Sequence, residues 1–198
     1  MSSEDTMNRQ TIVSLLTLLW ALWALAGCGT IYGVAVDQRN IKDVTADQKI
    51  KRSIQTKFMN DDLVGVLDVT PYVYLGDVYL VGEYESDEAR DRALEIAQNE
   101  EGAGRVTAYM KPKPDPDHDP CGTVDGVTVV AKVKKELIAD KRIWSTNVDV
   151  THVNCETVVL LGLVGSQEEI DMSIAHARGV EGVTEVQSFL RVYAPSAE

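Results

Sequence analysis

Hydrophobic residues follow two different periods along the chain, and each period predicts one kind of element. Ile50, Ile54 and Phe58 recur every four residues, which predicts a helix with one apolar face, starting near residue 47. Short apolar runs follow at residues 66–70 and 78–82, and each run predicts a strand. The first third of the chain after the leader is therefore expected to fold as a helix followed by two strands.

A second helix and a third strand complete this pattern. Ser86 stands before two acidic residues and predicts a helix start, because its hydroxyl can accept a hydrogen bond from an unpaired backbone N–H. Gly102 predicts the end of that helix, and residues 106–110 predict the last strand. Pro71 and Gly76 are expected to lie in the turn region between the first two strands.

The same order of elements returns in the second half of the chain. A helix is predicted over residues 126–140, strands at 148–151 and 158–162, a helix starting at Ser166, and a final strand at 186–193. The segments 68–70 and 149–151 also share an Asp-Val-Thr sequence, and matching segments lie about 80 residues apart. Two copies of one unit explain this pattern.

These elements predict an α+β fold with two tandem domains. In each copy the adjacent strands form a hairpin, and the helix between the second and third strands is a crossover connection. Each domain is therefore expected to be a three-stranded mixed sheet with two helices on one face. The predicted division is a leader at 1–27, a tether at 28–46, domains at 47–110 and 125–193, a Pro/Asp-rich linker at 111–124 and a tail at 194–198.

The leader carries an uncharged, leucine-rich run that ends in Leu-Ala-Gly-Cys at residues 25–28. This ending resembles the lipobox of bacterial lipoprotein signal peptides, which implies lipidation of Cys28, including a palmitate-type acyl chain. Gly29 in place of Asp then implies the periplasmic face of the outer membrane. A retained transmembrane helix and a soluble secreted form are the alternatives, although the run is shorter than the roughly 20 residues that a bilayer requires.

Composition excludes some functions. The net charge of −12 disfavours nucleic acid as a partner through the overall field of the protein, so any binding to an anionic surface must be local. If Cys28 is lipidated, Cys121 and Cys155 remain, and in an oxidising compartment they predict a disulfide; two unrelated thiols are the alternative. The linker acids around His118 are expected to be solvated rather than to bind metal.

The sequence offers no arrangement typical of catalysis. No histidine stands beside a nucleophile, no Cys-x-x-Cys pair occurs, and the glycines end helices and strands instead of forming a phosphate loop. We therefore expect no catalytic residues, no cofactor, no metal site and no enzymatic activity.

The second copy resembles the BON domain, a module of bacterial outer-membrane and nodulation proteins. The residues that carry this resemblance are the hydrophobic strand at 158–162 that ends in glycine, the helix start at Ser166, the Gly-Val turn at 182–183 and the last strand at 186–192. The first copy is similar over 47–110. Together with the leader, this implies a dual BON-domain outer-membrane lipoprotein that maintains envelope integrity through binding rather than catalysis.

The resemblance implies that anionic phospholipid is contacted by the first helix of the second domain. That helix and the segment after it contain five bases and an aromatic residue: Lys132, Lys134, Lys135, Lys141, Arg142 and Trp144. A solvated basic face is the alternative, because the first domain has a similar group of bases. The alternative function is a periplasmic chaperone or adaptor that binds envelope proteins through free sheet edges.

Overall fold

The computed structural model describes residues 40–64, 69–114, 125–155 and 157–193. Residues 39–198 belong to one compact unit. The predicted leader, Cys28 and most of the predicted tether, as well as Cys121 and most of the linker, lie outside the described residues. Among the described residues, no helix has the length and apolar character needed to cross a bilayer.

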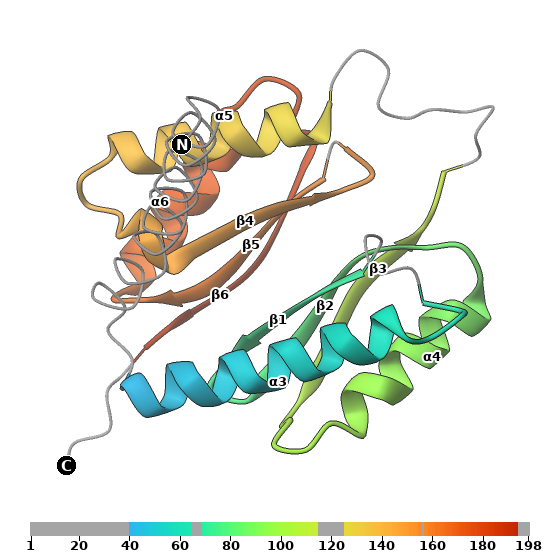
Figure 1. The fold of residues 1–198 in the computed structure, drawn as a ribbon. Helices are drawn as coiled ribbons and strands as arrows, with labels where there is room; N and C mark the ends of the chain where they lie inside the picture. Colours follow the sequence, from blue (N-terminus) through green and yellow to red (C-terminus); the bar gives the residue numbers. More distant parts are fainter. Residues whose placement is uncertain (1–39, 65–68, 115–124, 156, 194–198) are drawn as a thin grey trace, which may run out of the picture. The chain divides into compact units, whose positions relative to one another are not determined.

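The compact unit contains two copies of the predicted order of elements (Figure 1). The first copy consists of α3 (Ile41–Met59), β1 (Val69–Tyr74), β2 (Asp77–Tyr84), α4 (Asp87–Gln98) and β3 (Val106–Pro112). The second copy consists of α5 (Gly126–Ala139), a 3-10 turn η1 (Ser145–Asn147), β4 (Val148–Val153), β5 (Thr157–Val164), α6 (Gln167–Arg178) and β6 (Glu185–Val192).

Each copy forms its own three-stranded mixed sheet, as predicted. In the first sheet, β2 lies between an antiparallel β1 and a parallel β3. In the second, β5 lies between an antiparallel β4 and a parallel β6. The α+β prediction and the hairpin-plus-crossover topology are confirmed.

One face of each sheet is covered by the two helices of the same copy. In the first copy, Ile54 and Phe58 of α3 pack with Ala93 of α4 over Leu80 of the central strand. The second copy repeats this arrangement, with the buried residues of α5 and α6 over β5. The four-residue spacing that predicted these helices is therefore the spacing of their buried faces.

The opposite faces of the two sheets pack against each other. A single apolar cluster combines residues of both sheets: Tyr74, Tyr79 and Val81 from the first, and Val153, Val159, Leu161 and Leu163 from the second. The ring of Phe189 lies 5.4 Å from that of Tyr79 and 6.0 Å from that of Tyr109. Because β5 is buried along its whole length, its uninterrupted apolar sequence matches a strand covered on both faces.

Polar contacts surround this apolar cluster and link the two domains. The guanidinium of Arg191 pairs with Asp77 at 2.6 Å and donates a second hydrogen bond to the carbonyl oxygen of Tyr74 at 3.1 Å. The hydroxyl of Tyr74 donates to Asp149 at 2.5 Å. These bonds satisfy polar groups that the packing of the sheets removes from water, and they fix which faces meet.

The first helix begins at Ile41, earlier than the start near residue 47 that the sequence predicted. Asn40 caps α3 by accepting a hydrogen bond from the backbone N–H of Lys42 at 3.0 Å. Val44 is buried and extends the apolar face of the helix toward its start. A buried polar residue, Asp47, stands between Val44 and Ile50 on this face and obscured the apolar pattern in the sequence.

Pro71 lies within β1, not in the predicted turn region. Because β1 is an edge strand, a residue without a backbone N–H is tolerated there. The turn itself is formed by Leu75 and Gly76, which have φ values of 54° and 79°. Similarly, Lys111 and Pro112 belong to β3 and not to the predicted linker.

The packing between the sheets predicts that the two domains unfold together. Replacing the fully buried Leu161 with alanine should lower the free energy of unfolding by about 2–5 kcal/mol, because it leaves a cavity between the sheets. Urea denaturation should show one transition at a lower midpoint. Val192→Ala, at a position that is 46% exposed, is the control and should change the midpoint little. Two separate transitions in Leu161→Ala would contradict the shared core.

Candidate functional site

Helix α5 has a buried apolar face and an opposite face on which apolar side chains are exposed. Asp125 caps its start by accepting from the backbone N–H of Val127. Val133 and Leu137 are buried against the second sheet. In contrast, Val127 and Ile138 are 66% and 68% exposed.

Helical spacing brings these exposed apolar residues onto the same face as cations. Val127, Ala131, Lys134, Lys135 and Ile138 recur at intervals of three or four residues and are all exposed. We call these five residues the outer face of α5. This face thus combines cationic and apolar side chains, the two kinds of group with which interfacial helices contact a membrane surface.

The lysines predicted to bind phospholipid are not engaged in ion pairs with described residues. Lys132, Lys134, Lys135 and Lys141 are exposed, and none forms an ion pair with another described residue. In the first domain, by comparison, Lys57 pairs with a glutamate on the adjoining turn, and the ammonium of Lys51 lies 5.2 Å from the centre of the Tyr72 ring. Lys49 and Arg52 of the first domain are also exposed and form no ion pair with another described residue, so the structure separates the two basic groups only at Lys51 and Lys57.

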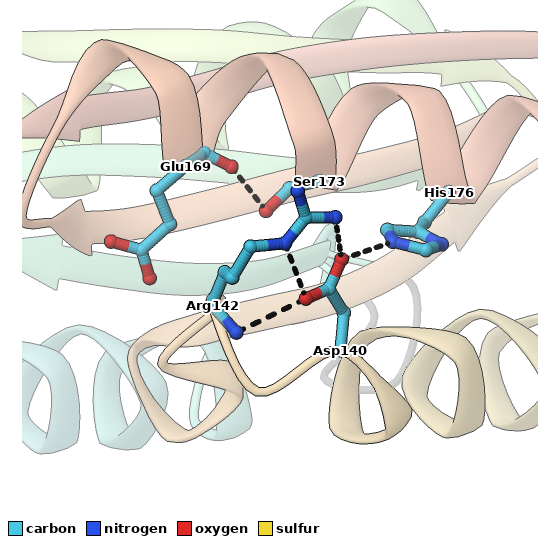
Figure 2. Close-up of polar contacts among 5 residues, drawn as sticks. All are labelled: Asp140, Arg142, Glu169, Ser173 and His176. Carbon is cyan, nitrogen blue, oxygen red and sulfur yellow. Dashed lines mark hydrogen bonds and ion pairs between the residues drawn. The ribbon is translucent and has the colours of Figure 1, made fainter.

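Arg142, the fifth predicted base, forms an ion pair with the carboxylate of Asp140 (Figure 2). Its Nη2 and Nε lie 2.7 Å and 3.0 Å from the two carboxylate oxygens of Asp140, and the Nε2 of His176 lies 3.0 Å from one of them. The hydrogen bonds from Arg142, and then that from His176, hold the pKa of Asp140 well below its usual range. This cluster joins the end of α5 to α6, so Arg142 is placed to stabilise the loop.

Trp144 lies just beyond this cluster, and a buried carboxylate fixes its backbone. Glu169 is only 4% exposed, and it accepts hydrogen bonds from the backbone N–H groups of Trp144 at 2.7 Å and Gly165 at 2.9 Å. Trp144 as a whole residue is 49% exposed. The Trp144 side chain is therefore presented at the surface from an anchored backbone.

Glu169 is a residue that the sequence reading missed. The signal was present, because Ser166 and Glu169 have the spacing of a capping box, in which the glutamate returns to the N-cap backbone. Here Ser166 does cap α6, but the carboxylate reaches Gly165 and Trp144 instead. The corresponding position in the first domain, three residues after the cap Ser86, is Ala89.

Several predicted features lie partly or wholly outside the described residues. Cys155 is disulfide-bonded, while Cys121 and Cys28 are not described, so the Cys121–Cys155 pairing stays a prediction. The lipidation of Cys28 is also a prediction. Among the described residues, no group of three or more histidine, cysteine or acidic side chains could hold a metal ion.

Two helix–strand–strand–helix–strand domains, each with a mixed three-stranded sheet and two helices on one face, define a small tandem α+β protein. The chain belongs to the BON domain family: the model of this domain matches residues 46–114 and 125–194. Both copies are therefore BON domains.

The chain is also similar to individual proteins. It is 25% identical over 149 residues to osmotically-inducible protein Y of Escherichia coli (strain K12), covering 73% of this chain and 72% of that protein. The solved C-terminal domain of CdsD, a structural protein of the type III secretion system of Chlamydia trachomatis, is 10% identical with a TM-score of 0.30, covering 75% of this chain and 67% of the other.

A second solved CdsD structure is 12% identical, with a TM-score of 0.30, and covers 74% of this chain. That match spans 63% of the solved chain, which is less than two thirds of its length. At these TM-scores, neither structure bears on the arrangement or the role of the domains described above.

Removing the buried carboxylate should release the Trp144 loop. Glu169→Ala leaves two backbone N–H groups without an acceptor and should lower the free energy of unfolding by about 2 kcal/mol. With Trp20 and Trp23 replaced by phenylalanine, the fluorescence of Trp144 reports on the loop directly and should shift in the variant. Glu168→Ala, at an exposed neighbouring position, should leave both readouts unchanged. An unchanged emission in Glu169→Ala would contradict the positioning role.

The Asp140 cluster predicts a pH-dependent contribution to stability. Because the pKa of Asp140 is lowered in the folded protein, its contribution is present above the ordinary aspartate pKa of about 3.9 and is lost as pH falls toward the folded value. Urea unfolding should show Asp140→Asn less stable than the wild type at pH 7. That difference should shrink below about pH 4. A difference that is constant with pH would contradict the ionic role of Asp140.

Proposed function

We propose that this chain is a non-enzymatic outer-membrane lipoprotein that maintains envelope integrity by binding anionic phospholipid. The observation that carries the proposal is the outer face of α5, where uncommitted lysines alternate with exposed Val127 and Ile138. Membership of the BON domain family and the similarity to a protein named for osmotic induction support a role in the stressed envelope.

The charges of α5 are suited to an anionic surface even though the whole chain is acidic. Each lysine near such a surface contributes about 1 kcal/mol, and this attraction extends only over roughly a Debye length. Lys134, Lys135 and Lys141 can act together because none is neutralised by a described carboxylate. The distant acidic residues are screened by salt, so the local field of α5 governs the contact.

Trp144 adds an apolar anchor at the end of the same segment. Indole rings favour the region between the headgroups and the acyl chains, because they combine an apolar body with a hydrogen-bond donor. With its backbone held by Glu169, the ring pays little ordering cost when it inserts. Val127 and Ile138 would enter the same boundary region from the helix.

Lipidation of Cys28 would provide attachment, so α5 would set orientation. Two or more acyl chains give stable anchoring without help from the protein. The tethered domains then meet the membrane at a high local concentration, and even a weak surface on α5 is sufficient to select one orientation.

A periplasmic adaptor or chaperone is the second candidate function. It is favoured by the edge strands of the second sheet, since β4 is hydrogen-bonded on one side only and contains no proline. An extended segment of another protein could add to such an edge through backbone hydrogen bonds.

Vesicle binding tests the proposal in the predicted mature chain, residues 28–198 carrying Cys28→Ser, which lacks both the apolar leader and the acylation site. The chain should co-sediment with vesicles containing anionic phospholipid, less at high salt, and Lys134→Glu with Lys141→Glu should weaken binding at least roughly tenfold. The matched control is Lys49→Glu with Arg52→Glu, which makes the same charge change on α3.

The two pairs of substitutions should therefore behave differently. Equal losses in both would mean that net charge and not α5 governs binding, and this result would contradict the proposed site. No binding by the parent chain at any salt concentration would overturn the phospholipid function and favour the adaptor.

A further inference from the structure

A groove of about 530 Å³ lies between α5 and α6, beside the outer face of α5. Its lining includes charged residues of both signs and an apolar floor: Lys132, Lys135, Glu136, Glu181, Met172 and Val180. Lys135 belongs to both the groove and the outer face, so the two surfaces are continuous. The volume is in the range of sites for small organic ligands.

The groove has equal numbers of lysines and glutamates that form no ion pair with another described residue. Lys132, Lys135, Glu136 and Glu181 are exposed, and none of them forms an ion pair with another described residue. The remaining charged groups of the lining, Arg142 and His176, both contact Asp140. Two available cations and two available carboxylates would attract and repel a simple anion about equally. They complement a ligand that carries both charges.

In the first domain, a polar bridge spans the equivalent position beside α3. Glu100 accepts a hydrogen bond from the hydroxyl of Ser53 at 2.9 Å and pairs with Lys57 at 2.8 Å, and its side chain is only 7% exposed. With the repeat offset of about 80 residues, Val180 occupies the position of Glu100 in the second domain. Valine cannot form this bridge, and Lys132 and Lys135, which line the groove, form no ion pair with another described residue.

We propose that the groove binds the zwitterionic headgroup of a membrane phospholipid, a phosphate ester joined by two carbons to a primary ammonium. Lys132 and Lys135 bind the phosphate, and Glu136 and Glu181 bind the ammonium. Met172 and Val180 contact the carbon atoms between them. This rests on the proposed function, because the outer face of α5 brings the opening of the groove to the membrane.

Soluble headgroups test the site without a membrane. The full chain carrying Cys28→Ser is titrated with glycerophosphoethanolamine, with glycerol 3-phosphate and with ethanolamine, and backbone amide NMR signals are followed. Glycerophosphoethanolamine should shift the signals of Lys132, Lys135 and Glu136 and should bind roughly tenfold tighter than either fragment, because only it engages both charge pairs. No shift with any probe, or equal binding of glycerol 3-phosphate, overturns the proposal.

A charge reversal at an exposed position sharpens the test. Glu181→Lys should weaken glycerophosphoethanolamine binding roughly tenfold and strengthen glycerol 3-phosphate binding, whereas an anion site would bind both more tightly. Glu101→Lys, the same change at the corresponding exposed position of the first domain, should change neither.

Vesicles of phosphatidylethanolamine in a neutral phosphatidylcholine background should compete with the soluble headgroup. Failure to compete would overturn the assignment of a lipid ligand. Failure of the proposed function is seen separately, as loss of binding to anionic vesicles while headgroup binding remains.

Discussion

The burial of both faces of each sheet is the constraint on which the rest of the structure depends. Helices cover one face of each sheet, and the sheet of the other domain covers the second face through the cluster around Leu161. Arg191 and Tyr74 fix this arrangement with hydrogen bonds across the domain boundary. As a consequence, the sheets offer no broad surface to a partner, and the helices provide the faces at which binding can occur.

The two domains share this fold but differ in the residues at the surface of their helices. In the first domain, Lys57 of α3 pairs with Glu100, just after α4. In the second, Val180 stands at the corresponding position and lines a groove, and Glu169 holds the backbone of an exposed Trp144. These substitutions alter the surface while the buried spacing of each helix stays the same, so the proposed membrane contact falls on the second domain.

The order of elements and the family could be predicted from the sequence because buried positions recur with a fixed period, as at Ile50, Ile54 and Phe58. The start of α3 could not be predicted, because it depends on the hydrogen bond that Asn40 accepts. The place of Pro71 within a strand could not be predicted either, because it depends on β1 being an edge strand. The lysines of α5 were identified, but their availability was not, since it depends on where carboxylates distant in sequence lie. The packing of the two sheets against each other has one trace in the sequence, the unbroken apolar run of β5. Such a run indicates a strand buried on both faces, but periodicity alone does not distinguish it from a buried helix.

Broadening of backbone amide signals by a spin-labelled lipid measures most directly which surface meets the membrane. The predicted mature chain, residues 28–198 carrying Cys28→Ser, would be mixed with anionic vesicles that contain a lipid labelled at its headgroup. The proposed orientation predicts strong broadening along the outer face of α5 and at Trp144, with α3 little affected. Equal broadening of α3 and α5, or broadening confined to the strand edges, would contradict a membrane contact made by the second domain's helix.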